Sequence, residues 1–167
     1  MPRPSTTGIN GVDTHSQLVA EKLSGRSRCF PYIVTCGSAL EEWSKKYAGD
    51  FLLGFWADEI KKKFLIQGFA AFKEHLQQCY RTVGHLSALN PGSLPSWPIS
   101  GQEALFAILG GREFVQQVIG VTYSDTFLMH PSKTMSGICF ESEVAYENCQ
   151  HCPLTDCPGR RAPQIKE

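Results

Sequence analysis

Residues 50–81 read DFLLGFWADEIKKKFLIQGFAAFKEHLQQCYR, and this longest periodic stretch of the chain decides the fold. Its large apolar residues recur at intervals of three, four and five, with lysines and glutamines between them. This spacing predicts an amphipathic helix of about eight turns, with an interruption near Gly68, because glycine weakens a helix interior. Helical spacing accounts for every aromatic residue in the stretch. We therefore interpret these residues as core packing and not as the wall of a cofactor site.

Shorter elements flank this helix on both sides. Residues 30–36 (FPYIVTC) and 134–140 (TMSGICF) are rich in β-branched and aromatic side chains and predict buried strands, and 115–123 predicts another. Helices are expected over 17–23, capped by Ser16, and over 38–49, capped by Ser38. A further short helix follows a capping box at 100–103 (SGQE). A few strands mixed with long helices indicate the α+β class.

Composition divides the chain into three parts. Residues 1–15 are rich in Pro, Gly, Ser, Thr and Asn and predict a loose N-terminal arm, residues 16–144 form one domain, and 145–167 form a cysteine-rich tail. Within the domain, residues 89–99 (LNPGSLPSWPI) hold three prolines and a glycine. Because proline disrupts both helices and central strands, this segment is expected to be a loop of fixed conformation.

Charge and hydropathy exclude several classes of protein. The 167 residues include 16 basic and 16 acidic side chains, so there is no basic surplus to neutralise nucleic-acid phosphates. No apolar run approaches the ~18 residues of a membrane span, and the first residues lack the apolar region of a signal peptide. We therefore expect a cytoplasmic protein that binds neither nucleic acid nor membrane.

The cysteines cluster at the C-terminal end. Three of the seven, Cys149, Cys152 and Cys157, lie within nine positions. A two-residue gap lets two thiolates reach one ion from a single turn, so this spacing predicts a metal site, with Cys139 as the expected fourth ligand. We expect an iron–sulfur cluster ahead of zinc, and His151 is an alternative ligand for zinc. Free thiols, or a redox-sensitive disulfide between Cys149 and Cys152, are the other interpretations.

Other reactive residues give weaker signals. The five histidines do not recur at a metal-ligand spacing, and no phosphate-binding glycine loop or nucleophile elbow is present. His130, in a turn between two predicted strands, is the histidine that we expect near a site. Arg160 and Arg161 could hold an anion, but we interpret them as a solvated pair.

Three stretches resemble a known family. AFKEHLQQCYR (71–81) resembles the family helix Ala-Phe-x-Glu-x-Leu-x-x-x-x-Arg, and NPGSLPSWP (90–98) is similar to its loop Pro-Gly-Tyr-Pro-x-Cys-Pro. GVTYSDTFLMHPSKTMSGICF (120–140) resembles Gly-x-x-Leu-Thr-Glu-Ser-x-x-Met-x-Pro-x-x-Ser-Val-Ser-Gly, which is the most specific of the three patterns. The family is the activation domain of cobalamin (vitamin B12)-dependent methionine synthase, in particular its short stand-alone versions from anaerobic bacteria.

The resemblance implies both a fold and a function. The fold would be a twisted antiparallel sheet with long helices. The domain would bind S-adenosylmethionine and close over a corrinoid held by a partner, where lapsed cobalamin is reduced and remethylated. The cofactor-binding residues that the matching motifs imply are Asn90, Pro91, Gly92, Ser93, Met129, His130, Ser136 and Gly137.

This chain departs from the family at several positions. Ala88 and Ser93 stand where the family has the arginine and tyrosine that help to hold S-adenosylmethionine, and Gln77-Gln78 replaces a His-Glu pair. Loss of the arginine removes a partner for the carboxylate of the methyl donor, which counts against S-adenosylmethionine binding.

Two functions follow as hypotheses. The first is an accessory to a corrinoid methyltransferase such as methionine synthase, which supports reductive reactivation or methylation of cobalamin bound by a partner protein or domain. A cluster on Cys139, Cys149, Cys152 and Cys157 would then relay an electron to the cobalt. The alternative is a non-catalytic binding module with a structural zinc site in its tail.

Overall fold

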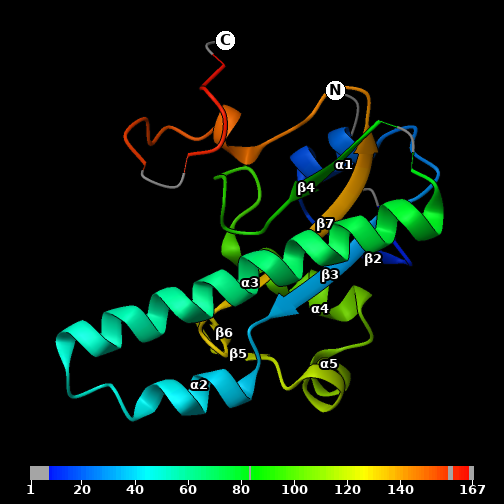
Figure 1. Cartoon of the computed structure of the whole chain (residues 1–167). Helices are drawn as coiled ribbons and strands as arrows, with labels where there is room; N and C mark the ends of the chain where they lie inside the picture. Colours follow the sequence, from blue (N-terminus) through cyan, green and yellow to red (C-terminus); the bar gives the residue numbers. More distant parts are fainter. Residues whose placement is uncertain (1–7, 83, 158–159, 166–167) are drawn as a thin grey trace.

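The computed structural model describes residues 8–82, 84–157 and 160–165. At its centre is a three-stranded antiparallel sheet in the order β3-β7-β4 (Figure 1). The strands are β3 (Phe30–Thr35), β7 (Thr134–Ser142) and β4 (His85–Leu89). Strand β7 pairs on both sides, with Cys139 opposite Phe30 in β3 and Ala88 in β4. The strands predicted at 30–36 and 134–140 are therefore confirmed, and β7 is the buried centre of the sheet.

Helices cover both faces of this sheet. On one face, α3 (Phe51–Tyr80) packs over Tyr32 and Cys139 through the residues of its C-terminal half, including Leu76. On the other face, α1 (Gln17–Leu23) and α4 (Gln102–Ile108) pack against Ile138 and Phe140. Because side chains alternate along a strand, β7 supplies a buried row to each layer. The α+β class is confirmed.

The long helix forms in one piece. Asp50 caps it by accepting a hydrogen bond from the Leu53 backbone N–H at 2.8 Å, and α3 runs 30 residues through Gly68 without the expected interruption. The interpretation of its aromatic residues is correct only for the second half. Phe69 and Phe72 pack on the sheet, but Phe51, Phe55, Trp56 and Phe64 are all more than half exposed.

Several local predictions are corrected. The strand expected at 115–123 is α5 (Arg112–Ile119), followed by the short β5 (Thr122–Tyr123), which pairs with β6 (Met129–His130). Within α5 only Val115 is buried, against Phe106 and Val121, whereas a half-buried strand would bury every second residue. The expected cap at Ser16 is confirmed, because its side chain accepts a hydrogen bond from the Val19 backbone N–H, but the caps expected at Ser38 and at 100–103 are wrong. Gly37 precedes α2 (Ser38–Lys45) and Gly101 precedes α4, without side-chain caps.

The remaining segments pack on this core. A small hairpin of β1 (Gly8–Ile9) and β2 (Val12–Asp13) buries Ile9, while residues 1–7 of the predicted arm lie outside the described residues. The loop after β4 is held by Trp97, which is 1% exposed, and leads into the short helix η1 (Ile99–Gly101). In the tail, η2 (Asn148–Gln150) follows the buried Tyr146. None of the helices described is long and apolar enough to span a bilayer.

Candidate functional site

A hollow of about 530 Å³ opens where four segments of the chain meet. The loop after β4 forms one side, the start of α4 forms the base, and the β6–β7 connection forms the opposite side. Arg161 of the tail closes the edge. The lining residues run from Asn90 to Arg161 along the chain, so only the tertiary fold creates the hollow.

The structure brings together most of the predicted cofactor-binding residues. Asn90, Pro91, Ser93, Met129 and Ser136 line the hollow. Two others support its walls without lining it. Gly92 has φ +80°, and its backbone N–H bonds to the carbonyl oxygen of Trp97 at 2.8 Å, while Gly137 lies in β7 behind Asn90.

His130 differs from the other predicted residues. It lies in β6 opposite Thr122, is exposed, and is not among the residues that line the hollow. The peptide bond between His130 and Pro131 is cis.

A buried hydrogen-bond network holds the floor of the hollow. The Asn90 amide donates to the Tyr32 hydroxyl at 2.6 Å and to the Ser136 carbonyl at 2.7 Å, and it accepts from the Asn148 amide at 3.1 Å. Ser136 in turn donates its hydroxyl to Gln102 at 2.8 Å. Because the Asn90 amide is satisfied by protein groups, Asn90 orients the loop after β4 and joins it to the sheet and to the tail.

Tyr32 and Gly137 restrict the protonation state and the geometry of this network. Burial raises the pKa of Tyr32 well above its usual value, and Cys139 adds a smaller increase. The hydrogen bond from Asn90 and the charge of Arg161 lower this pKa, but by less than burial raises it. Tyr32 is therefore a neutral hydroxyl at physiological pH. A Cβ on Gly137 would lie 2.2 Å from the Leu89 carbonyl oxygen and 2.9 Å from the Tyr32 oxygen, so only glycine allows this approach.

The walls of the hollow combine apolar and charged groups. Phe127, Leu128 and Met129 supply apolar surface on the β6 side. Arg161 is the one arginine or lysine among the described lining residues, and it forms an ion pair with Glu147 at 3.0 Å. A guanidinium carries five N–H donors, so this pair leaves donors for an anionic ligand. The hollow therefore suits an organic molecule with an apolar body and a carboxylate.

The interpretation of Arg160 and Arg161 as a solvated pair is wrong for Arg160, while Arg161 is exposed. Arg160 donates to the backbone carbonyl oxygens of Cys149, Cys152 and Leu154 at 2.6, 3.0 and 2.6 Å. It thereby folds the tail around its own guanidinium, and this places the next residue, Arg161, at the hollow. Two adjacent arginines in the sequence suggest a site for an anion. Their spacing gives no sign that Arg161 lies beside Asn90 and Ser136.

A second polar cluster lies beside the hollow, around Ser132. Glu41 of α2 accepts hydrogen bonds from the Ser132 hydroxyl at 3.0 Å and backbone N–H at 3.3 Å, and it pairs with Lys61 of α3 at 3.4 Å. Burial acts to raise the pKa of Glu41, but Ser132 and Lys61 outweigh it, so the pKa lies below its usual value. Through this cluster α2 and α3 are fixed to the β6–β7 connection.

The predicted metal ligands are not brought together. Cys139 is fully buried beneath α3 among Tyr32, Leu76 and Leu86, and burial raises its pKa to about 12. Cys149, Cys152 and Cys157 are half-buried free thiols of the tail. The Arg161 backbone N–H donates to Cys149 and lowers its pKa. Within residues 8–82, 84–157 and 160–165, no three His, Cys, Asp or Glu side chains are placed to hold a metal ion.

The fold and site define the chain as an α+β protein with a ligand-sized hollow at one end of an antiparallel sheet. Comparisons with protein-family models, with curated proteins and with solved structures find no match.

Proposed function

We propose that the protein is an accessory to a corrinoid methyltransferase such as methionine synthase, and that it binds S-adenosylmethionine in the hollow at Asn90. One observation carries the proposal. Two separate motifs that resemble the methionine synthase activation domain contribute residues to a single hollow, Asn90, Pro91 and Ser93 from one and Met129 and Ser136 from the other.

The size and chemistry of the hollow support this ligand. About 530 Å³ is within the range of ~300–1,000 Å³ for small-molecule sites. Phe127 and Met129 offer apolar surface to an adenosyl group, and Arg161 offers a guanidinium to the carboxylate of the methionyl group. Arg161 would thus supply from the tail the charge that is missing at Ala88, and this answers the main argument from sequence against S-adenosylmethionine binding.

The chain would contribute by positioning and by excluding water. Asn90 and Ser136 hold the walls of the hollow in one geometry, which lowers the entropic cost of aligning a methyl donor with its acceptor. A corrinoid held by the partner supplies the metal that accepts the methyl group. The finer activation-domain architecture, and a cytoplasmic setting for this reaction, are parts of the same proposal.

Calorimetric titration of the full chain with S-adenosylmethionine tests the proposal. We expect binding by the wild-type protein and a loss of roughly 10–100-fold in affinity for Arg161→Ala, which is the usual value of a hydrogen bond to a charged group. Arg28→Ala is the matched control, because Arg28 is also an exposed arginine in an ion pair, with Glu141. Equal affinity in wild type and Arg161→Ala would contradict the role of Arg161.

A second measurement tests the partner. The full chain should bind the cobalamin-loaded corrinoid domain of a methionine synthase more tightly with S-adenosylmethionine than without it. No binding to the loaded domain under either condition would reject the accessory function.

The alternative function, a binding module with structural zinc, depends on the tail. The positions of Cys139, Cys149, Cys152 and Cys157 do not fit a four-ligand site, so no step of the proposed reaction uses a cluster. Elemental analysis of anaerobically purified protein distinguishes the two. One zinc that is lost in Cys152→Ala, without S-adenosylmethionine binding, would favour the binding module, whereas bound iron would favour the electron relay.

A further inference from the structure

In the first half of α3, a charged side chain faces the protein and large apolar side chains face the solvent. Between residues 51 and 66, the side chains that face the protein are Ala57, Lys61 and Leu65. The large apolar residues occupy the rest of the circumference of the helix, and Phe51 is 94% exposed. A helix that places a lysine inward and aromatic residues outward has a second apolar face that needs a cover.

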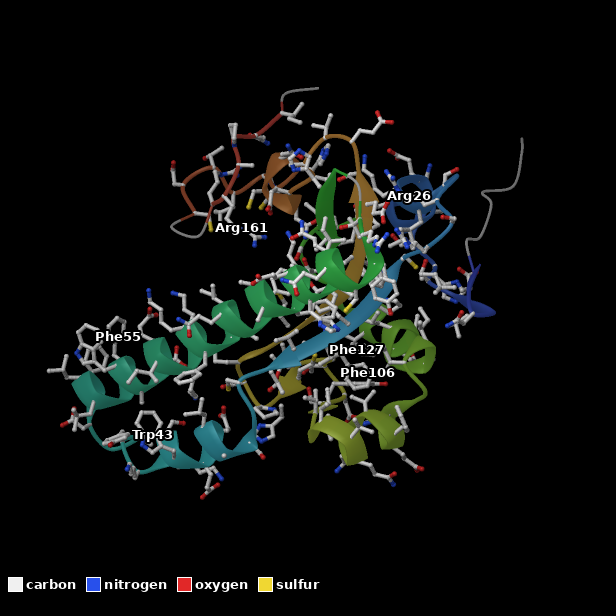
Figure 2. The ribbon with its side chains drawn as sticks, turned by 45° about the vertical axis from the view of Figure 1, so that its right-hand side comes forward. Arg26, Trp43, Phe55, Phe106, Phe127 and Arg161 are labelled. Carbon is white, nitrogen blue, oxygen red and sulfur yellow. The ribbon has the colours of Figure 1, made fainter. Side chains whose placement is uncertain are left out.

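The exposed apolar area of this half-helix is large. Eight large apolar side chains of this half-helix are 40–94% exposed, namely Phe51, Leu52, Leu53, Phe55, Trp56, Ile60, Phe64 and Ile66. At ~200 Å² for a whole side chain, they present on the order of 800 Å² around the circumference of the helix, and Leu53, Trp56, Ile60 and Phe64 contribute roughly half of this along one stripe. Figure 2 shows Phe55 at the far end of the α2–α3 hairpin, well away from Phe106 in the core.

The spacing of the exposed residues fits a second helix. Leu53, Trp56, Ile60 and Phe64 follow one another at intervals of three, four and four, so they form one stripe along the helix. The stripe ends at Phe64, since the next positions on this side are Gln67 and Ala71. Its length is therefore about three turns, centred near Ile60.

The charges around the stripe favour a copy of the same helix in the antiparallel direction. With a two-fold axis at Ile60, Trp56 of one copy lies opposite Phe64 of the other. Glu59 of one copy then comes within a turn of Lys63 of the other. A parallel pair would instead place Lys63 against Lys63. Residues 38–66 hold five lysines and five acidic residues, so this hairpin has no net charge with which to repel a copy or attract anionic lipid.

We propose that the protein forms a two-fold symmetric homodimer in which the N-terminal halves of two α3 helices pack antiparallel through Leu53, Trp56, Ile60 and Phe64. Nothing in this interface uses the hollow at Asn90. The dimer can therefore be tested independently of the proposed function.

Sedimentation equilibrium of the full chain over a range of concentrations tests the dimer. The wild-type protein should be dimeric, and Ile60→Glu should raise the dissociation constant by roughly 100-fold, because it places two carboxylates together at the axis. Val118→Glu is the matched control. It adds the same charge at an apolar position of α5 that is 62% exposed. Circular dichroism confirms that each variant keeps its helices.

A charge exchange tests the antiparallel direction. Glu59→Lys should weaken the dimer, and adding Lys63→Glu to that variant should restore it. A wild-type monomer up to millimolar concentration would overturn the proposal, as would a dimer that dissociates with Val118→Glu and not with Ile60→Glu. Cosedimentation of a monomer with phosphatidylcholine vesicles would also overturn it, in favour of a lipid surface.

Discussion

Replacing Gly137 with alanine tests the close packing of β7 behind the hollow. The new methyl group would lie 2.2 Å from the backbone carbonyl oxygen of Leu89 and 2.8 Å from the Asn90 amide nitrogen. A backbone oxygen cannot move aside as a flexible side chain can, so β4 and β7 must separate. The separation also breaks the hydrogen bonds that join Asn90 to Tyr32 and to Ser136.

The cost follows from these contacts. Overpacking a core costs ~1–3 kcal/mol, and each of the two lost hydrogen bonds adds about 1 kcal/mol. The free energy of unfolding should therefore fall by about 3–5 kcal/mol. Since a domain has only ~5–15 kcal/mol of stability, this is a severe loss.

Urea unfolding followed by circular dichroism measures the effect, and Gly49→Ala is the control. A Cβ on Gly49 has no atom within 4 Å, so the same substitution should change the free energy of unfolding by less than ~0.5 kcal/mol. A loss below ~1 kcal/mol for Gly137→Ala would refute the packing argument, because that value is smaller than overpacking alone.

Two further predictions concern pH and thiol reactivity. The pKa of Glu41 is lowered in the folded protein, so its contribution to stability is present above the usual carboxyl pKa and is lost as pH falls through the lowered value. The difference in urea midpoint between wild type and Glu41→Gln should accordingly be largest near neutral pH and shrink on acidification, and a difference that does not change with pH would contradict this. Cys79 is exposed and Cys139 fully buried, so iodoacetamide should modify Cys79 in the native protein and Cys139 only after unfolding, as measured by mass spectrometry of peptides. Early labelling of Cys139 would show that α3 does not cover it.

Local pattern in the sequence was sufficient for the central elements. The periodicity of residues 50–81 predicts α3 nearly to its ends, and the β-branched runs predict β3 and β7. These predictions hold because hydrophobic period and capping are properties of neighbouring residues. The motifs likewise predict Asn90, Pro91, Ser93, Met129 and Ser136 as members of one site, and these five residues line the hollow.

Long-range packing decided the rest. Val115 fits a strand or a helix equally well in a short apolar run, and burial against Phe106 and Val121 selects α5. Helical spacing also places Trp56 and Leu76 in one pattern, although only Leu76 has the sheet beneath it.

The site shows the same division between sequence and structure. Arg161 reaches the hollow because Arg160 gathers the carbonyl groups of the tail, and Cys139 is separated from the tail cysteines because alternation along β7 turns it toward α3. The sequence by itself determined the long helix, the strands β3 and β7, and five of the residues that line the hollow. Which faces are covered, and which side chains from distant segments meet, depends on contacts between parts of the chain that no local pattern records.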